Sequence, residues 1–239
     1  MIRTTEDVLH MLDSWLDEDS GIDWDAFYKD RERPVPFFAD RPDENILDYM
    51  ESGKIKPGRV LELGCGPGRN ALHFARNGFQ VDAVDSSAEA LSWASERAEK
   101  ESLPVRFIQE SLYNFDPEPG AYDLVYDSGC FHHVPPHRRE GYMSLVKKAL
   151  KPGGRFALTC FRENGPLGGS PMTDREIYEK RTMAGGLGFT EEKLRLIFHE
   201  FTEIEVRPMF VSKDPGVFGV EGLLAGLFEK RTAARKEKG

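Results

Sequence analysis

A glycine-rich segment followed by an acidic residue is the part of this sequence best suited to chemistry. The segment ELGCGPGRN (62–70) places Gly64, Gly66 and Gly68 at alternate positions, and residues without a side chain let a ligand approach the backbone closely. Asp85 follows Gly64 by 21 residues. At that spacing, an acid that ends a second strand can accept both hydroxyls of an adenosine ribose. The pattern predicts a loop that binds a nucleoside.

The neighbours of these glycines restrict which nucleotide the loop binds. Arg69 occupies the position where a dinucleotide fingerprint has its third glycine, and Pro67 removes one backbone donor. No Gly-Lys-Ser/Thr sequence follows, which excludes a phosphate-binding Walker loop. Glu62 suits a ligand that carries an ammonium group, as the methionine half of S-adenosylmethionine does. An NAD-dependent oxidoreductase is therefore disfavoured.

Alternating strands and helices are expected to position this loop. Short apolar runs predict the strands, and apolar residues at helical spacing predict the helices between them. Strands joined by single helices need right-handed crossovers, so they form a parallel sheet. We expect strands at 59–63, 79–85, 105–109, 122–129 and 155–161. We expect one helix at 69–77, a second that begins after Ser86 as its capping residue, and a third at 137–150. A turn is expected at 151–154.

The C-terminal part is expected to add an antiparallel edge. Two helical stretches lie near 174–183 and 190–200, and the segments 202–210 and 222–230 are close enough in sequence to form an antiparallel pair. The sequence therefore predicts an α/β fold with an open, mostly parallel sheet.

The first fifty residues differ in composition from the rest of the chain. They are acidic and aromatic around RPVPFF (33–38), where two prolines stop a helix. We expect one or two short helices and a loop here, so that residues 1–50 form a lid segment on a domain of residues 51–239. The expected lid residues are Trp24, Tyr28 and Phe37. The same rings would serve equally to fix the segment to the sheet.

Together these features resemble the class I S-adenosylmethionine-dependent methyltransferases. The resemblance rests on ELGCGPG (62–68), on the acid that ends the second strand and on LKPGG (150–154), and it covers residues 55–162. It implies a Rossmann-like sheet of seven strands with an antiparallel last strand, helices on both faces, and S-adenosylmethionine as the cofactor. The residues that it implies for cofactor binding are Glu62, Gly64, Gly66, Gly68, Asp85, Ser86 and Ser111. Cys65, Asn70, Glu110 and Asp127 complete the predicted cofactor site.

The resemblance also implies how these residues divide the cofactor between them. The glycine loop would line the methionine moiety, Asp85 would hold the ribose and Ser86 would lie near the adenine. The end of the third strand often supplies an acid beside the adenine amine. This chain has Ser111 at that position, so Ser111 or a backbone donor would make the contact.

A finer resemblance concerns the aromatic segment. WDAFYKDRERPVPFF (24–38), GRN (68–70) and the loop after the fifth strand resemble the thiopurine and tellurite-resistance methyltransferases. In that branch an aromatic N-terminal segment covers the cofactor, and the acceptors are small, soft nucleophiles. Several small-molecule branches share these traits.

The segment YDSGCFHHVPPHRR (126–139) carries the candidates for the transfer chemistry, because the end of its strand faces the ligand crevice of a parallel sheet. Asp127 would contact the methionine ammonium or orient an acceptor, and His132 and His133 are candidate general bases. Adjacent side chains point in different directions, so we expect at most one histidine to face the site. The pair would equally serve to close the strand. Further candidates for acceptor contacts are Phe131 and Arg162.

Composition narrows the possible partners. A formal charge of −9 disfavours nonspecific binding to nucleic acid. No apolar run approaches the roughly 20 residues of a membrane-spanning helix, and the acidic start does not resemble a secretory signal, so we expect a cytoplasmic protein without a membrane partner. Three cysteines without a CxxC pair argue against disulfides and structural zinc. No metal site is expected, because no acid or cysteine completes the histidines at ligand spacing.

The main functional prediction is a methyltransferase for a small-molecule acceptor with a sulfur, oxygen, nitrogen or metalloid nucleophile. Two alternatives remain: a methyltransferase that acts on tRNA or protein, and a noncatalytic regulatory protein that binds S-adenosylmethionine. The sequence leaves both a monomer and a homodimer open.

Overall fold

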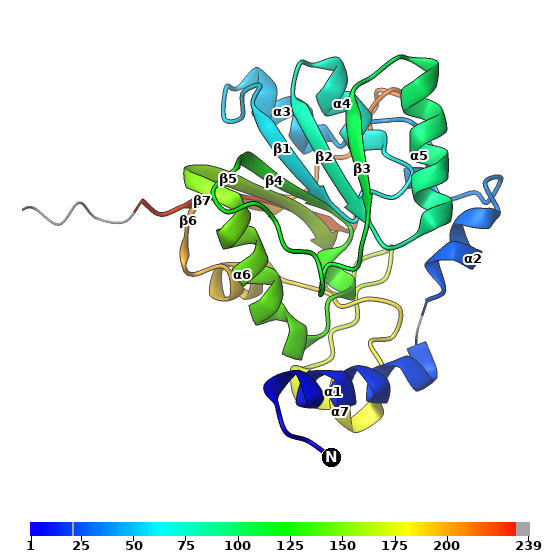
Figure 1. The fold of residues 1–239 in the computed structure, drawn as a ribbon, viewed down its shortest axis with the longest axis vertical. Helices are drawn as coiled ribbons and strands as arrows, with labels where there is room; N and C mark the ends of the chain where they lie inside the picture. The colour runs from blue at the N-terminus through cyan, green and yellow to red at the C-terminus, as the bar shows by residue number, and fades with distance from the viewer. Residues whose placement is uncertain (21, 233–239) are drawn as a thin grey trace, which may run out of the picture.

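A seven-stranded sheet organises the protein (Figure 1). The computed structural model describes residues 1–20 and 22–232, with the backbone alone for 17–20. The strand order is β3-β2-β1-β4-β5-β7-β6, and β7 runs antiparallel to both of its neighbours. This confirms the expected sheet with its antiparallel edge. The strands are β1 (Arg59–Leu63), β2 (Gln80–Asp85), β3 (Val105–Gln109), β4 (Tyr122–Ser128), β5 (Leu150–Phe161), β6 (Phe201–Pro208) and β7 (Leu223–Lys230).

Helices cover both faces of the sheet, each over its own apolar core. One core joins residues of β1 and β2 to Ile46, Tyr49 and Phe74, and the other joins the opposite face to Tyr142 and Phe198. Buried alternating side chains hold the two layers together, since successive residues of a strand point to opposite faces. The helices are α1 (Thr5–Ser20), α2 (Trp24–Lys29), α3 (Glu44–Glu51), α4 (Arg69–Arg76), α5 (Ala88–Lys100), α6 (Arg139–Ala149), α7 (Asp174–Lys180) and α8 (Glu191–Ile197).

Two local predictions were wrong. Ser87, and not Ser86, caps α5, since the Oγ of Ser87 accepts a hydrogen bond from the amide of Ala90 at 3.1 Å. The helix begins one residue later than predicted because the amide of Ser87 donates to Asp85 at 2.9 Å. The sequence KPGG (151–154) is not a turn but part of β5. The irregularity lies instead in the β4–β5 register between Tyr122 and Leu124, where the backbone at Gly154 passes close to Tyr122.

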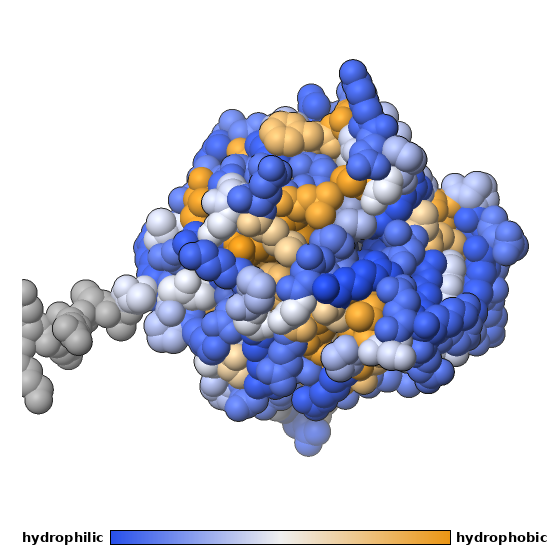
Figure 2. Space-filling model, turned by 90° about the horizontal axis from the view of Figure 1, so that it is seen from above, coloured by the Kyte–Doolittle hydropathy of each residue, from blue (hydrophilic) through white to orange (hydrophobic). Residues whose placement is uncertain are grey.

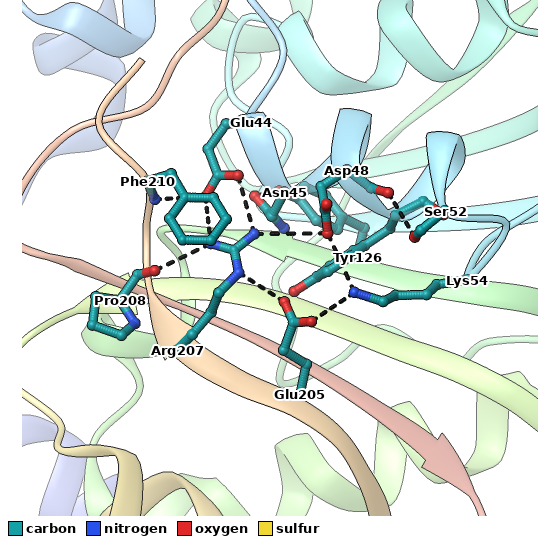
Figure 3. Close-up of polar contacts among 11 residues, drawn as sticks. Glu44, Asn45, Asp48, Ser52, Lys54, Tyr126, Glu205, Arg207, Pro208 and Phe210 are labelled. Atoms are coloured by element: carbon teal, nitrogen blue, oxygen red, sulfur yellow. Dashed lines mark hydrogen bonds and ion pairs between the residues drawn. The ribbon is translucent and has the colours of Figure 1, made fainter.

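The helix α3 ties the N-terminal region to the sheet. Its buried Ile46 and Tyr49 belong to one of the two apolar cores, so this stretch packs as part of the domain. The division of the chain at residue 50 remains a prediction. Polar contacts also join α3 to the sheet, as Figure 3 shows: Arg207 of β6 lies between Glu44 of α3 and Glu205. The distance from Arg207 Nη1 to Glu44 Oε1 is 2.6 Å. Both contacts fix α3 against the edge of the sheet.

The surface is mostly polar on the face that Figure 2 shows, with hydrophobic residues gathered in a few patches. The described helices include none with the length and apolar character that a bilayer crossing requires. Three-residue 3₁₀ turns complete the fold: η1 (Pro36–Phe38), η2 (Phe131–His133) and η3 (Pro136–Arg138).

Candidate active site

A cavity of about 490 Å³ opens at the carboxyl ends of β1, β2, β4 and β5, in the size range of small-molecule and cofactor sites. It has two parts. We call the first the polar half, and its residues are Glu62, Arg69, Asn70, Asp85, Ser86 and Ser128. We call the second the aromatic half, and its residues are Trp24, Phe37, His132, His133, Phe161, Val220 and Leu223. Successive ring contacts join Trp24 to His133, His133 to His132 and His132 to Phe161.

Most of the residues predicted for the site line this cavity, and a few do not. Those that line it are Glu62, Gly64, Cys65, Gly66, Asn70, Asp85, Ser86, Ser111, Trp24, Tyr28, Phe37, His132 and His133. Those that do not are Gly68, Glu110, Asp127, Phe131 and Arg162.

The glycine loop owes its shape to left-handed backbone conformations at Gly66 and Gly68 (φ +52° and +78°), which side chains disfavour. A Cβ at Gly66 would lie 2.9 Å from the hydroxyl of Tyr28, so the aromatic segment packs directly on the loop. A Cβ at Gly68 would instead meet Ala94 of α5 at 3.0 Å. Gly68 therefore serves helix packing and does not face the cavity.

Glu62 is a buried acid with an unpaired oxygen beside the cavity. Its side chain is 1 % exposed, and Oε2 has no hydrogen-bond partner among the described residues. Burial raises the pKa of Glu62 to about 8, and nearby Asp43 adds to the effect while Arg69 opposes it. An unsatisfied carboxyl of this kind is costly to bury, and an ammonium group in the cavity would supply the missing partner.

A buried ionic network that the sequence did not reveal supports this part of the cavity. Asp43, which is fully buried, accepts from Arg69 Nη1 at 2.5 Å, from Tyr126 at 2.5 Å and from Ser128 Oγ at 2.6 Å. Asn70 also donates to Asp43, at 3.2 Å. The amide of Asn70 is therefore turned toward Asp43 even though the residue lines the cavity.

Asp85 ends β2 and closes the polar half. Its Oδ2 accepts from the amide of Gly66 at 2.8 Å and its Oδ1 from that of Ser87 at 2.9 Å. Burial raises the pKa of Asp85 above its usual value, and the backbone hydrogen bonds oppose that rise. The backbone hydrogen bonds do not use all the lone pairs of the carboxylate, so Asp85 can still accept a hydrogen bond from a ligand hydroxyl.

The residues after β3 lie at the next edge of the cavity. Ser111, Leu112 and Tyr113 line it, whereas Glu110 turns away so that its Oε1 accepts from the amide of Ser111 at 3.0 Å. Glu110 was predicted to bind cofactor, but its local hydrogen bond holds it outside the cavity.

Asp127 does not reach the cavity, contrary to its predicted role. Its Oδ1 accepts from the amides of Cys130 and Phe131 at 2.9 and 3.2 Å, and its Oδ2 accepts from the hydroxyl of Tyr142 at 2.7 Å. The side chain is fully buried, and burial raises its pKa to about 6. Asp127 therefore shapes the turn that carries His132 and His133.

Two predicted acceptor contacts also lie elsewhere. Phe131 is fully buried among the rings of Tyr142, Phe189 and Phe198. Arg162 is exposed and lies outside the cavity lining. Phe131 belongs to the apolar core because η2 turns its side chain inward.

Both histidines line the cavity, although at most one was expected to do so. They lie on the tight turn η2, which brings their ring centroids to 4.3 Å. His132 also stacks on Phe161 at 3.7 Å, and its Nδ1 accepts from the Phe161 amide at 3.3 Å. Burial lowers the pKa of His133 to about 4 and holds that of His132 well below its usual range. Both rings are therefore neutral at pH 7.

The third histidine of the segment is engaged elsewhere. His137 contacts Asp13 of α1 through Nε2 at 2.7 Å and Tyr178 of α7 through Nδ1 at 2.7 Å. Among the side chains that the structure describes, those of residues 1–16 and 22–232, no three histidine, cysteine or acidic residues are grouped so that they could hold a metal ion.

The aromatic segment is both an anchor and a wall of the cavity. Phe27 and Phe38 pack within the segment and against Trp93 of α5, while Trp24 and Phe37 line the aromatic half. Different rings of the segment thus face the cavity and fix the segment to the domain, and the role of the segment as a lid remains a prediction.

Comparison with known proteins agrees with this geometry. Residues 60–154 match a family model described as a methyltransferase domain. The 2-heptyl-1-hydroxyquinolin-4(1H)-one methyltransferase of Mycobacteroides abscessus is 30% identical over 186 residues, which cover 70% of this chain and 81% of that one. A probable thiol methyltransferase 2 of Arabidopsis thaliana is 27% identical over 192 residues, 79% of this chain and 81% of that one.

A comparison with solved structures concerns the fold alone. A structure described as "Conversion of a Disulfide Bond into a Thioacetal Group during Echinomycin Biosynthesis" superimposes with a TM-score of 0.69 at 20% identity, covering 89% of this chain and 92% of that one. The chain belongs to the class I S-adenosylmethionine-dependent methyltransferases. It is an enzyme of that class with S-adenosylmethionine as its cofactor.

Proposed function

We propose that this enzyme methylates a small-molecule acceptor held in the aromatic half of the cavity. The observation that carries the proposal is the continuity of that cavity, which runs from Glu62 and Asp85 to Trp24, His133 and Phe161. A donor and an acceptor held side by side in one cavity would meet the need of an in-line displacement for alignment, and the aromatic walls would exclude part of the water.

The polar half is proposed to hold the cofactor. S-adenosylmethionine supplies a methyl group on a positively charged sulfur. The unpaired Oε2 of Glu62 suits the ammonium of the methionine part, and Asp85 suits the ribose hydroxyls. Ser111 and the backbone beside it are proposed to contact the adenine, where the family more often has an acid.

The nature of the aromatic half supports a small acceptor over a macromolecule. Its walls come from the segment that holds Trp24 and Phe37 and from Phe161, Val220 and Leu223, which together suit a compact apolar body. The two relatives named above carry names that specify a hydroxyquinolinone and a thiol. Space beyond the polar half also disfavours a noncatalytic binding protein, which would need no acceptor pocket. Membership of the thiopurine and tellurite-resistance branch remains a proposal.

A two-part experiment tests this function. Calorimetric titration measures binding of S-adenosylmethionine, with NAD as the comparison, and release of S-adenosylhomocysteine is then scored with thiols, phenols, amines, halide and tellurite. We expect binding of S-adenosylmethionine and turnover with at least one small molecule. Turnover with bulk tRNA or protein and with none of the small molecules would contradict the proposal.

A further inference from the structure

His132 is held in one position by its neighbours. Its ring stacks on Phe161 with an interplanar angle of 16°. A Cβ added at Gly186 would lie 3.2 Å from His132 Cδ2, and one at Gly129 would lie 3.5 Å from Cε1. The side chain is 4 % exposed, yet it lines the cavity. A fixed ring that still reaches the cavity is suited to a directional contact with a ligand.

The backbone determines which ring nitrogen of His132 carries the proton. Because the amide of Phe161 donates to Nδ1, Nδ1 is the unprotonated nitrogen, and Nε2 of the neutral ring is a donor. This tautomer is assigned from the hydrogen bond. Protonation at Nδ1 would break that bond, so His132 is poorly placed to act as a base.

Charged groups are confined to the polar half. Among the described residues that line the cavity, the carboxylate and guanidinium groups are Glu62, Arg69 and Asp85, and Arg69 is paired with Asp43. His133 is the titratable neighbour of His132 and is a weak base, since burial lowers its pKa to about 4. The other recorded neighbours of the His132 ring are Phe161, Gly129 and Gly186, none of which titrates. Tyr28, Cys65 and Cys130 also line the cavity, and burial raises the pKa of each, so they stay neutral. The aromatic half thus offers an apolar surface and a fixed N–H donor.

On the basis of the function proposed above, we propose that His132 donates its Nε2–H to the acceptor, and that this acceptor is a small apolar molecule whose oxygen or sulfur nucleophile binds as an anion. Such an anion has several lone pairs, so one can accept the hydrogen bond while another reacts. An amine nitrogen has a single lone pair, which the same hydrogen bond would occupy. The positive charge of the donor sulfur also attracts an anion and repels a cationic acceptor.

The proposed reaction balances without a further reactant. The acceptor releases its proton to water as it binds, because neither histidine is a strong base. Its oxygen or sulfur then forms a bond to the methyl carbon as the carbon–sulfur bond of the donor breaks, and both electrons of that bond stay on the donor sulfur. The acceptor therefore loses a proton and gains a methyl group, while His132 stays neutral.

A series of acceptors with graded acidity tests the anionic form. Substituted thiophenols and phenols, with anilines of the same size for comparison, are assayed for kcat/KM between pH 5 and pH 10 by release of S-adenosylhomocysteine. We expect kcat/KM to rise with pH through the pKa of each acceptor, so that the midpoint moves along the series, and anilines to react far more slowly. The cofactor is kept saturating at every pH, so that the titration of Glu62 does not set the midpoint. A midpoint that then stays fixed while the acceptor changes would reveal an enzyme base and overturn the proposal.

Two substitutions of His132 test the donor role. His132→Gln keeps an N–H near the position of Nε2, and His132→Leu removes it. We expect kcat/KM to fall about ten- to hundredfold in the leucine variant, the scale of one hydrogen bond to a charged group, and much less in the glutamine variant. His199→Gln, an exposed histidine outside the cavity, is the matched control and should leave kcat/KM unchanged. Equal losses in the two His132 variants would contradict the donor role.

Two independent measurements keep this inference separate from the proposed function. Nitrogen-15 NMR of the intact protein at pH 7 should show Nε2 of His132 protonated and Nδ1 unprotonated, whereas the opposite tautomer would overturn the inference without any assay. Methylation of anilines in preference to thiols and phenols would also overturn it, while the proposed small-molecule function would stand. Binding of S-adenosylmethionine, measured in the same samples, shows that each variant retains its cofactor site.

Discussion

The polar half and the aromatic half of the cavity are built from different parts of the chain. Apart from Ser128 at the end of β4, the polar half lies on β1, the glycine loop and the end of β2, a stretch of about 25 residues. The aromatic half joins Trp24 and Phe37 to η2, to Phe161 at the end of β5 and to Leu223 at the start of β7. The difference separates two tasks: a compact local motif binds the shared cofactor, and distant segments assemble the surface that chooses the acceptor.

The largest expected effect is on the network beneath the polar half. Asp43→Ala would leave Arg69 buried without its ionic partner, and we expect the free energy of unfolding in urea to fall by about 3–5 kcal/mol. Asp174→Ala, which removes an exposed partner of Arg139, is the control and should change it by less than about 1 kcal/mol. Similar losses in the two variants would show that the Asp43 network is not the rigid base of the polar half.

The next effect concerns cofactor binding alone. Asp85→Ala removes the acceptor proposed for the ribose hydroxyls, so we expect affinity for S-adenosylmethionine to fall by about 1–3 kcal/mol, the scale of a lost hydrogen bond to a charged group. Calorimetric titration measures the change. Wild-type affinity in this variant would refute the ribose role.

A pH series tests the role of Glu62. Because burial raises its pKa to about 8, Glu62 is protonated in the free protein at neutral pH, and an ammonium ligand favours the ionised form. Binding should then release a proton, and affinity for S-adenosylmethionine should rise between pH 6 and pH 7.5 by up to about tenfold per pH unit. Titration in buffers of different ionisation enthalpy detects the proton. In Glu62→Gln the pH dependence should be lost, and its persistence would assign the proton to another group.

A substitution in the aromatic half is expected to have the smallest effect on the affinity for S-adenosylmethionine. Phe37→Leu keeps an apolar side chain but changes the shape of the wall, so kcat/KM for an accepted substrate should fall while the affinity for S-adenosylmethionine changes little. Parallel calorimetry and turnover assays measure both. If affinity and turnover fell together, the two halves would not be separable.

The same division explains how much the sequence could predict. The glycine loop, Asp85 and the alternation of strands and helices follow local rules, because glycine spacing and apolar periodicity are properties of neighbouring residues. Asp43 could not be predicted, since its partner Arg69 lies 26 residues along the chain and no motif marks the pair. The orientation of His132 depends on the amide of Phe161, 29 residues away. Asp127 has the residue type of a site acid, but only the fold shows that Tyr142 and two amides already occupy it.

A structure with bound S-adenosylhomocysteine tests the central claim most directly. We predict the ligand amino group within hydrogen-bond distance of Glu62, the ribose hydroxyls on Asp85, and the sulfur directed toward the aromatic half near His132. A ligand bound with its amino group and ribose away from these two carboxyls would contradict the account.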